Sequence, residues 1–376
     1  MKLLIINCVC GIRSTGRIVT DIAFEYQNNG YEVKIAYGRE SVPEQYSGYA
    51  VRIGNEINVK LNAALCRVFD NDGFSAKKQT HEFLKWADSF DPDVVWLHNL
   101  HGYYINVELL FDWIKSRPQM EVKWTLHDCW AFTGHCSHFA YEKCFKWKSC
   151  CESCPLVREY PSSLVFDNSR KNFLNKKRIF NNVNNLTIVT PSKWLAEIVG
   201  ESFLGNYPIQ VSYNRIDEDV FKPTNSDFRK KYKLENKIII LGVASAWGEK
   251  KGLYDFYKLS EMLDDEYQIV LVGLTEKQIK KVPDCIIAIS RTNSKQELAE
   301  IYSAADVFLN LTYEDNYPTV NLEAQACGTP VITYKTGGSP ESVPPENVIN
   351  VGDLSEAKRK IMEVINCGKN ENFISD

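Results

Sequence analysis

The chain has 376 residues, a formal net charge of −4, 44% hydrophobic residues and 24% charged residues. This length is enough for two domains of ordinary size, and the composition is typical of a soluble globular protein. The mildly negative charge gives no global attraction to nucleic acid, so we expect no nucleic-acid partner.

The N-terminal residues are apolar over a stretch too short for a signal peptide. No segment approaches the roughly 20 apolar residues that a membrane span needs. Twelve cysteines without an export signal favour a reducing compartment, where they are thiols or metal ligands. We therefore expect a cytoplasmic protein.

Buried strands alternate with amphipathic helices along the whole chain, as in Rossmann-like units. In the first half, we expect strands at 2–7, 32–37, 94–97, 122–126 and 186–190, and helices at 17–28, 75–90 and 107–115. In the second half, we expect strands at 238–244, 268–272, 285–289, 307–311 and 330–333, and helices at 253–263, 295–304, 318–327 and 353–367. The sequence thus predicts an α/β fold with parallel sheets.

Six of the twelve cysteines lie in the segment 129–154. Four of them have a spacing that ends in C-x-x-C and could close a structural zinc site: Cys136, Cys144, Cys151 and Cys154. Cys150 and His138 are spare candidate ligands. The alternative is a set of reduced thiols packed among aromatic side chains, and both interpretations remain open.

The segment 162–181 interleaves Lys and Arg with apolar residues, which predicts a basic amphipathic helix. Such a helix suits an anionic membrane surface. A solvated charged helix is the alternative interpretation.

The stretch 306–341 predicts a strand, a polar turn and a helix that begins near Pro318 and ends at Gly328. The free N–H groups and the dipole of such a helix make an anion site at the turn. Asp315 and Glu323 flank it, with seven residues between them. A carboxylate inside the helix repels phosphate but accepts hydrogen bonds from ribose hydroxyls. An anion site at the turn and a ribose contact on the helix together indicate a nucleotide-diphosphate site.

This acidic-x7-acidic spacing, followed by A-x-A-C-G-x-P-V-I and a G-G-x-x-E loop, resembles the retaining glycosyltransferases of family four. The resemblance implies the GT-B fold, in which two Rossmann-like domains face each other across a cleft. It implies an acceptor-binding domain at 1–190 with a Cys-rich insert at 129–154, and a nucleotide-sugar-binding domain at 191–355. The segment 356–376 would be a C-terminal helix that crosses back to the first domain.

The resemblance also implies roles for single residues. Glu323 would hold the ribose, and three residues form the expected catalytic set: His127 facing the hexose, Asp315 at the donor sugar and Lys251 at the diphosphate. The remaining donor-binding candidates lie in loops and in the polar turn: Gly16, Arg291, Glu314, Asn316, Tyr317 and Thr319.

Some positions allow more than one interpretation. Gly11 is the second choice after Gly16 for the glycine near the donor phosphate, and either glycine could serve only the turn. Asp128 could orient the ring of His127. The two histidines that follow strand 94–97, at positions 98 and 101, either line the cleft or are satisfied loop residues.

The sequence departs from the family at two places. Asp315 stands where the family usually has Glu, with Glu314 beside it. Ala246 stands where the family has an Arg for the diphosphate, which leaves one fewer cation unless Lys250 or Arg291 reaches in.

The implied activity is that of a metal-independent hexosyltransferase. It would move a sugar from a nucleotide-diphosphate sugar to a glycan or polyprenyl-linked acceptor in surface polysaccharide biosynthesis, peripherally on the inner face of the membrane. No D-x-D motif stands in a loop, so we expect no catalytic metal ion, and the structural zinc remains one of the two interpretations of the cysteines. The alternatives are a sugar-nucleotide epimerase of the same architecture and a non-catalytic partner subunit.

Overall fold

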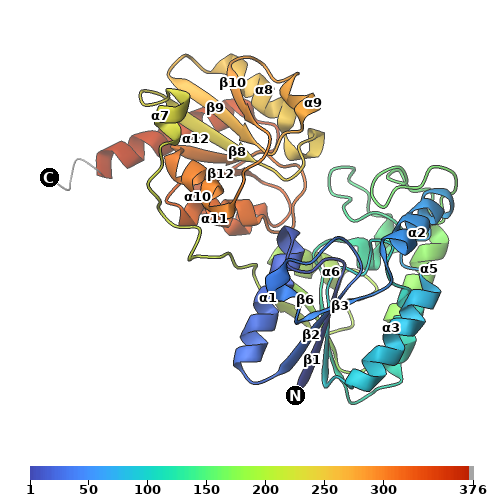
Figure 1. The fold of residues 1–376 in the computed structure, drawn as a ribbon. Coiled ribbons are helices and arrows are strands. Elements are labelled where there is room, and N and C mark those ends of the chain that lie inside the picture. The colour runs from blue at the N-terminus through green and yellow to red at the C-terminus, as the bar shows by residue number, and fades with distance from the viewer. Residues whose placement is uncertain (372–376) are drawn as a thin grey trace. The chain divides into compact units, whose positions relative to one another are not determined.

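The computed structural model describes the backbone of residues 1–371 and the side chains of residues 1–366. The chain divides into two compact units, Met1–Tyr213 and Asn214–Asp376. Each unit is built around one parallel sheet with helices on its faces (Figure 1). The predicted α/β fold class is therefore confirmed.

The first unit contains a seven-stranded sheet in which every strand pair is parallel. The strand order is β3-β2-β1-β4-β5-β6-β7. The strands are β1 (Lys2–Asn7), β2 (Glu32–Tyr37), β3 (Ala50–Arg52), β4 (Val94–Leu97), β5 (Glu121–Thr125), β6 (Leu186–Thr190) and β7 (Ile209–Val211).

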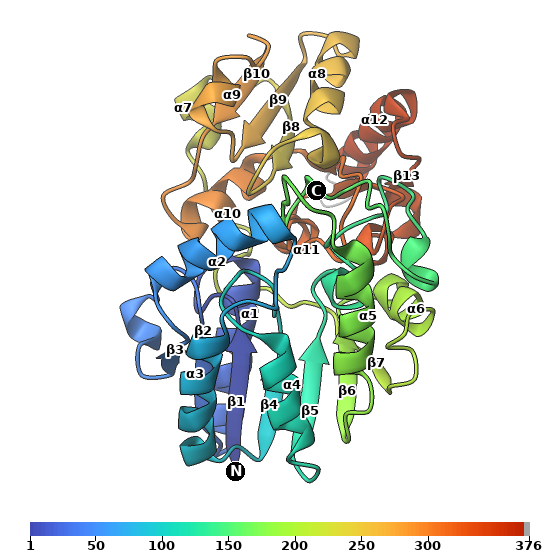
Figure 2. The same ribbon diagram turned by 90° about the vertical axis from the view of Figure 1, so that its right-hand side faces the viewer.

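Helices cover both faces of this sheet, so the central strands are apolar on both sides. The helices are α1 (Arg13–Asn28), α2 (Glu56–Phe69), α3 (Lys77–Phe90), α4 (Val107–Lys115), α5 (Ser169–Phe180) and α6 (Lys193–Gly200). Leu3 and Ile5 of β1 pack with α1, whereas Leu4 and Ile6 face the larger core that α3, α4 and α5 complete. Figure 2 shows these three helices side by side on one face.

The second unit contains a six-stranded parallel sheet with the order β10-β9-β8-β11-β12-β13. Its strands are β8 (Ile238–Val243), β9 (Tyr267–Val272), β10 (Ile286–Ile289), β11 (Val307–Asn310), β12 (Val331–Tyr334) and β13 (Val348–Ile349). Its helices are α7 (Phe228–Tyr232), α8 (Leu253–Met262), α9 (Glu276–Ile279), α10 (Lys295–Ala304), α11 (Thr319–Ala326) and α12 (Leu354–Glu371). One core lies under α8 and α12, and the other lies under α7, α10 and α11.

The domain boundary predicted between residues 190 and 191 is wrong, because the first sheet continues beyond β6. Strand β7 pairs with β6, with Ile188 opposite Ile209. Helix α6 buries Leu195 and Val199 in the core of the first unit. The first unit therefore extends to Tyr213.

Two helices of the first unit differ from the expectation. The helix expected at 162–181 is present only as α5, because the backbone N–H groups of Leu164 and Phe166 bond to carbonyls at the end of α2. Helix α2 itself was not expected. It begins at a capping box in which the side chains of Asn55 and Asn58 each accept the other's backbone N–H.

Helix α12 agrees with the expected C-terminal helix, although residues 372–376 of that prediction lie outside the described part of the chain. Ala357 and Ile361 are buried in a core of the second unit. The crossing of this helix to the first unit stays a prediction. None of the helices in the described residues is long and apolar enough to cross a bilayer.

Candidate active site

The turn between β11 and α11 brings two of the predicted catalytic residues together. The ammonium Nζ of Lys251 lies 2.7 Å from Oδ2 of Asp315. The same ammonium donates to the carbonyl oxygen of Glu314 at 3.4 Å. In this structure, the cation expected at the diphosphate is therefore paired with the carboxylate expected at the donor sugar.

The backbone explains why these residues meet. Strands β8 and β11 are neighbours, so the loops that follow them lie at the same edge of the sheet. Gly252 has φ +73°, and a Cβ atom there would lie 2.1 Å from the carbonyl oxygen of Leu311. The N–H of Tyr313 donates to the carbonyl of Lys250 at 2.8 Å. The main chain of the lysine loop thus packs directly on the turn.

Glu323 projects from the second turn of α11 and is half-buried. One of its carboxylate oxygens, Oε2, accepts a hydrogen bond of 3.1 Å from the hydroxyl of Tyr302 on α10. Burial and the charge of Glu323 raise the pKa of Tyr302 well above its usual value, so the phenol stays protonated and donates. The carboxylate is therefore held by a partner that the sequence analysis missed. The apolar pattern of the helix at 295–304 marks Tyr302 only as a core residue.

The other residues of the turn occupy distinct environments. Glu314 is buried, and its Oε2 lies 3.4 Å from the ammonium of Lys250. Asn316 is also buried. Tyr317 is half-buried, and its carbonyl accepts from the Asn214 amide at 3.3 Å. Thr319 is the first residue of α11.

Arg291 lies apart from this group. It is exposed and follows β10, which is separated from β11 by β9 and β8 in the sheet. Lys250 is the other cation considered as a replacement for the Arg missing at Ala246, and it lies beside the buried Glu314. In the structure, Lys251 therefore lies against the turn, whereas Arg291 lies at the far end of the same sheet edge.

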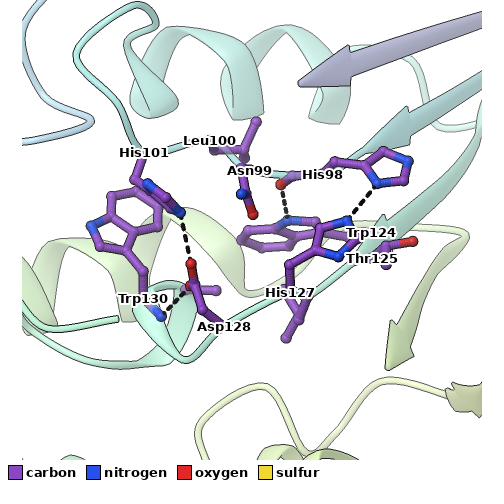
Figure 3. Close-up of a pocket in the computed structure, with 11 residues that line it drawn as sticks. His98, Asn99, Leu100, His101, Trp124, Thr125, His127, Asp128 and Trp130 are labelled. Carbon is purple, nitrogen blue, oxygen red and sulfur yellow. Dashed lines mark hydrogen bonds and ion pairs between the residues drawn. The ribbon is translucent and has the colours of Figure 1, made fainter. Parts of the chain in front are cut away.

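In the first unit, β4 and β5 are parallel neighbours, so the residues that follow them meet at one edge. Nδ1 of His98 lies 2.9 Å from Nε2 of His127, and the two rings stack with centroids 5.2 Å apart (Figure 3). Burial lowers the pKa of His127 to about 4 and lowers that of His98 well below its usual value. Both rings are therefore neutral near pH 7, and one donates to the other.

The carboxylate of Asp128, which the sequence analysis proposed for orienting His127, binds His101 and the backbone of Trp130. Its Oδ2 lies 2.7 Å from Nε2 of His101, and its Oδ1 accepts from the N–H of Trp130 at 2.9 Å. Although burial opposes both charges, the pair raises the pKa of His101 and lowers that of Asp128 to about 2. These residues and the His98–His127 pair line one pocket (Figure 3). The role of orienting His127 falls to His98.

The two candidate glycines lie in the segment that follows β1. Gly16 is buried inside α1, which begins earlier than expected, so it is not a loop residue. Gly11 has φ +73°, and a Cβ atom there would lie 2.3 Å from the ring of Tyr46. The carbonyl of Gly16 accepts the N–H of Gly11 at 2.9 Å. Gly11 is therefore the position that requires glycine, because a side chain there would strain the backbone.

The four candidate zinc ligands line one pocket of the segment between β5 and α5: Cys136, Cys144, Cys151 and Cys154. The thiols of Cys136 and Cys154 are hydrogen-bonded to each other, which lowers the pKa of Cys154 to about 7. Within the described residues, no group of three or more His, Cys, Asp or Glu side chains is arranged to hold a metal ion. The zinc site stays a prediction.

Comparison with known proteins supports the family resemblance of the second unit. The model of the family described as glycosyl transferases group 1 matches residues 224–375, which is nearly the whole of the second unit. The second unit therefore resembles the group 1 glycosyl transferases. The resemblance to glycosyltransferase family four is thereby confirmed.

Two curated relatives and one solved structure extend this comparison. WcaC of Escherichia coli (strain K12), described as a colanic acid biosynthesis glycosyl transferase, is 24% identical over 353 residues, which are 85% of this chain and 80% of WcaC. The N,N'-diacetylbacillosaminyl-diphospho-undecaprenol alpha-1,3-N-acetylgalactosaminyltransferase of Campylobacter jejuni is 28% identical over 124 residues, 31% of each chain.

The solved structure is Anabaena Alr3699/HepE in complex with UDP-glucose. It superposes with a TM-score of 0.67 at 14% identity, and the alignment covers 98% of this chain and 91% of that one. At this identity the likeness shows the fold alone. The fold is thus that of the GT-B class, with two Rossmann-like units.

We expect Gly252→Ala to destabilise the second unit. A left-handed conformation costs a residue with a side chain about 1–2 kcal/mol, and the new Cβ atom would also meet the Leu311 carbonyl. The midpoint of thermal unfolding should fall by several degrees. Gly248→Ala is the matched control, because an added Cβ there meets nothing within 4 Å and the backbone is extended. Equal midpoints for the two variants would contradict the packing described.

We expect the free energy of unfolding to decrease as the pH falls from 6.5 toward about 4. In this window the unfolded chain binds a proton at His127 that the folded chain does not bind, so stability rises with pH. Urea unfolding at several pH values measures the slope. His127→Gln should flatten it, whereas His81→Gln, at an exposed position on α3, should not. An unchanged slope in the His127 variant would show that the ring titrates normally.

A zinc site in the four-cysteine pocket predicts about one zinc ion per chain in protein purified without chelator. Mass spectrometry of the metal content measures this. Cys151→Ser and Cys154→Ser should lose the metal, and Cys285→Ser, at an exposed thiol of the second unit, should keep it. Parent protein without zinc would refute the site.

Proposed function

We propose that the protein transfers a hexose from a nucleotide-diphosphate sugar to a glycan or lipid-linked acceptor in surface polysaccharide biosynthesis. The transfer proceeds with retention at the anomeric carbon and needs no catalytic metal ion. The observation that carries this proposal is the pairing of Lys251 with Asp315 at the turn before α11, with Glu323 on that helix.

Glu323 is suited to hold the two ribose hydroxyls of the donor. Tyr302 occupies one of its oxygens and fixes the plane of the carboxylate. A carboxylate has about four acceptor positions, so further hydroxyl donors can bind. A phosphate at the same place would be repelled by the negative charge, which gives the donor one orientation along α11.

Lys251 and the N-terminus of α11 are suited to hold the diphosphate. An incoming diphosphate offers the ammonium two negative charges in place of the single charge of Asp315. As the bond between the anomeric carbon and the diphosphate oxygen breaks, negative charge grows on that oxygen. The ammonium and the helix dipole stabilise this charge more in the transition state than in the bound donor.

His127 is the proposed contact of the first unit with the transferred hexose. Its Nε2 is paired with His98, which fixes the ring plane. A neutral imidazole can exchange one hydrogen bond with a sugar hydroxyl without bringing charge to the anomeric centre. His98 is accordingly a positioning residue.

The relatives support the choice of donor and acceptor. The name of WcaC places that protein in colanic acid biosynthesis, and the name of the Campylobacter transferase gives it a diphospho-undecaprenol substrate. The Anabaena structure contains UDP-glucose. The match of residues 224–375 to a transferase family model favours transfer over the epimerase and the non-catalytic subunit.

Titration calorimetry with UDP, GDP and ADP tests the ribose contact. Hydrogen bonds to a charged group contribute about 1.5–3 kcal/mol each, so Glu323→Ala, which removes two, should raise the Kd of the nucleotide that binds roughly a hundredfold or more. Tyr302→Phe should weaken binding less, since the carboxylate remains. The control is Glu346→Ala, because Glu346 is exposed and lies outside the turn and helix α11. Unchanged affinity in Glu323→Ala would refute the assignment.

A further inference from the structure

Helix α2 exposes an apolar face to solvent. The exposed fractions are 68% for Ile57, 59% for Leu61, 44% for Leu65, 37% for Val68 and 45% for Phe69. Spacings of three and four residues place the first four side chains along one side of the helix. A surface helix of a globular protein normally carries polar residues there.

The segment after residue 163 extends this face. Leu164, Val165 and Phe166 are 56%, 64% and 52% exposed. The N–H of Leu164 donates to the Arg67 carbonyl at 2.7 Å, and that of Phe166 donates to the Val68 carbonyl at 3.1 Å. The ring of Phe166 stacks on that of Phe69 with centroids 5.9 Å apart. We call the eight side chains the α2 patch: Ile57, Leu61, Leu65, Val68, Phe69, Leu164, Val165 and Phe166.

The fold of the first unit does not require these side chains. The opposite side of α2 already packs inward through Val59, Asn62 and Cys66. The Asn62 amide donates to the Tyr103 carbonyl at 3.0 Å and so ties the helix to the loop after β4. A contiguous exposed apolar surface of this kind marks an interaction site rather than part of a core.

Basic residues flank the apolar side of α2, and others lie on α5, the helix that follows residues 164–166. Lys60 and Arg67 are exposed on α2 itself, and Lys171 and Lys177 are exposed on α5. The acidic residues nearby are engaged elsewhere. Glu56 pairs with Arg52 at the start of the helix, and Asp167 accepts the N–H groups of Cys154 and Ser169. The rim of the patch therefore attracts an anionic partner.

We propose that the α2 patch docks the protein on the surface of an anionic phospholipid bilayer. Its apolar side chains would enter the boundary between headgroups and acyl chains, and the basic rim would bind the headgroups. The inference rests on the proposed function in one respect, since a lipid-linked acceptor lies in such a bilayer.

The position of the patch suits this role. The Asn62–Tyr103 hydrogen bond places α2 at the edge of the sheet where His98 and His127 lie. Figure 2 shows the helix crossing that side of the first unit. The surface predicted from the sequence was the basic helix alone. In the structure, the apolar component comes from α2 and from residues 164–166, which are not helical.

Vesicle flotation tests the proposal with the full-length protein and no substrate. The vesicles are phosphatidylcholine, alone or with about one quarter phosphatidylglycerol. The parent should float with the anionic vesicles, and Leu61→Glu combined with Val165→Glu should lower the bound fraction about tenfold. Val351→Glu is the control, since Val351 is 43% exposed in the second unit. Arg67→Glu should weaken binding to the anionic vesicles only.

Further measurements separate the outcomes. The double variant should keep the thermal midpoint and the nucleotide affinity of the parent, and Glu323→Ala should still float. Nucleotide binding by Glu323→Ala therefore tests the proposed function, and flotation tests the membrane proposal separately. Flotation of the double variant equal to that of the parent would overturn the proposal. A second result would also overturn the proposal: the parent protein does not bind vesicles and is a dimer by light scattering, whereas the double variant is a monomer. The patch would then join two copies of the chain.

Discussion

The parallel pairing of neighbouring strands is the constraint on which the rest of the structure depends. In a parallel sheet, the loops that follow adjacent strands emerge at the same edge. The pairing of β4 with β5 therefore brings His98 to His127, and the pairing of β8 with β11 brings Lys251 to Asp315. Both groups consist of residues distant in sequence that the sheets place in hydrogen-bonding range.

Much of this arrangement could be predicted from the sequence, because it follows from local patterns. The apolar runs located the principal strands to within a residue or so. Gly328, with φ +85°, follows the end of α11 as expected. Gly252, which follows Lys251, adopts the left-handed conformation that only glycine takes easily.

Other features depend on tertiary contacts that no local pattern encodes. Asp128 is next to His127 in the sequence, but its carboxylate accepts a hydrogen bond from His101. His101 follows β4, the neighbouring strand in the sheet. Tyr302 has the pattern of a core residue, and only the packing of α10 on α11 turns its hydroxyl to Glu323. Helix α2 is apolar on two sides, so it lacks the single stripe by which amphipathic helices are recognised.

The lysine loop has a consequence for how the substrate range of such a protein can change. Two main-chain contacts position the backbone of this loop: the close approach of Gly252 to Leu311 and the Tyr313–Lys250 hydrogen bond. Side chains of the turn other than Asp315, whose carboxylate pairs with the ammonium, can therefore be exchanged in evolution or by design without displacing the lysine loop. Preference for a new sugar can therefore arise while the contact between Lys251 and the leaving diphosphate stays the same.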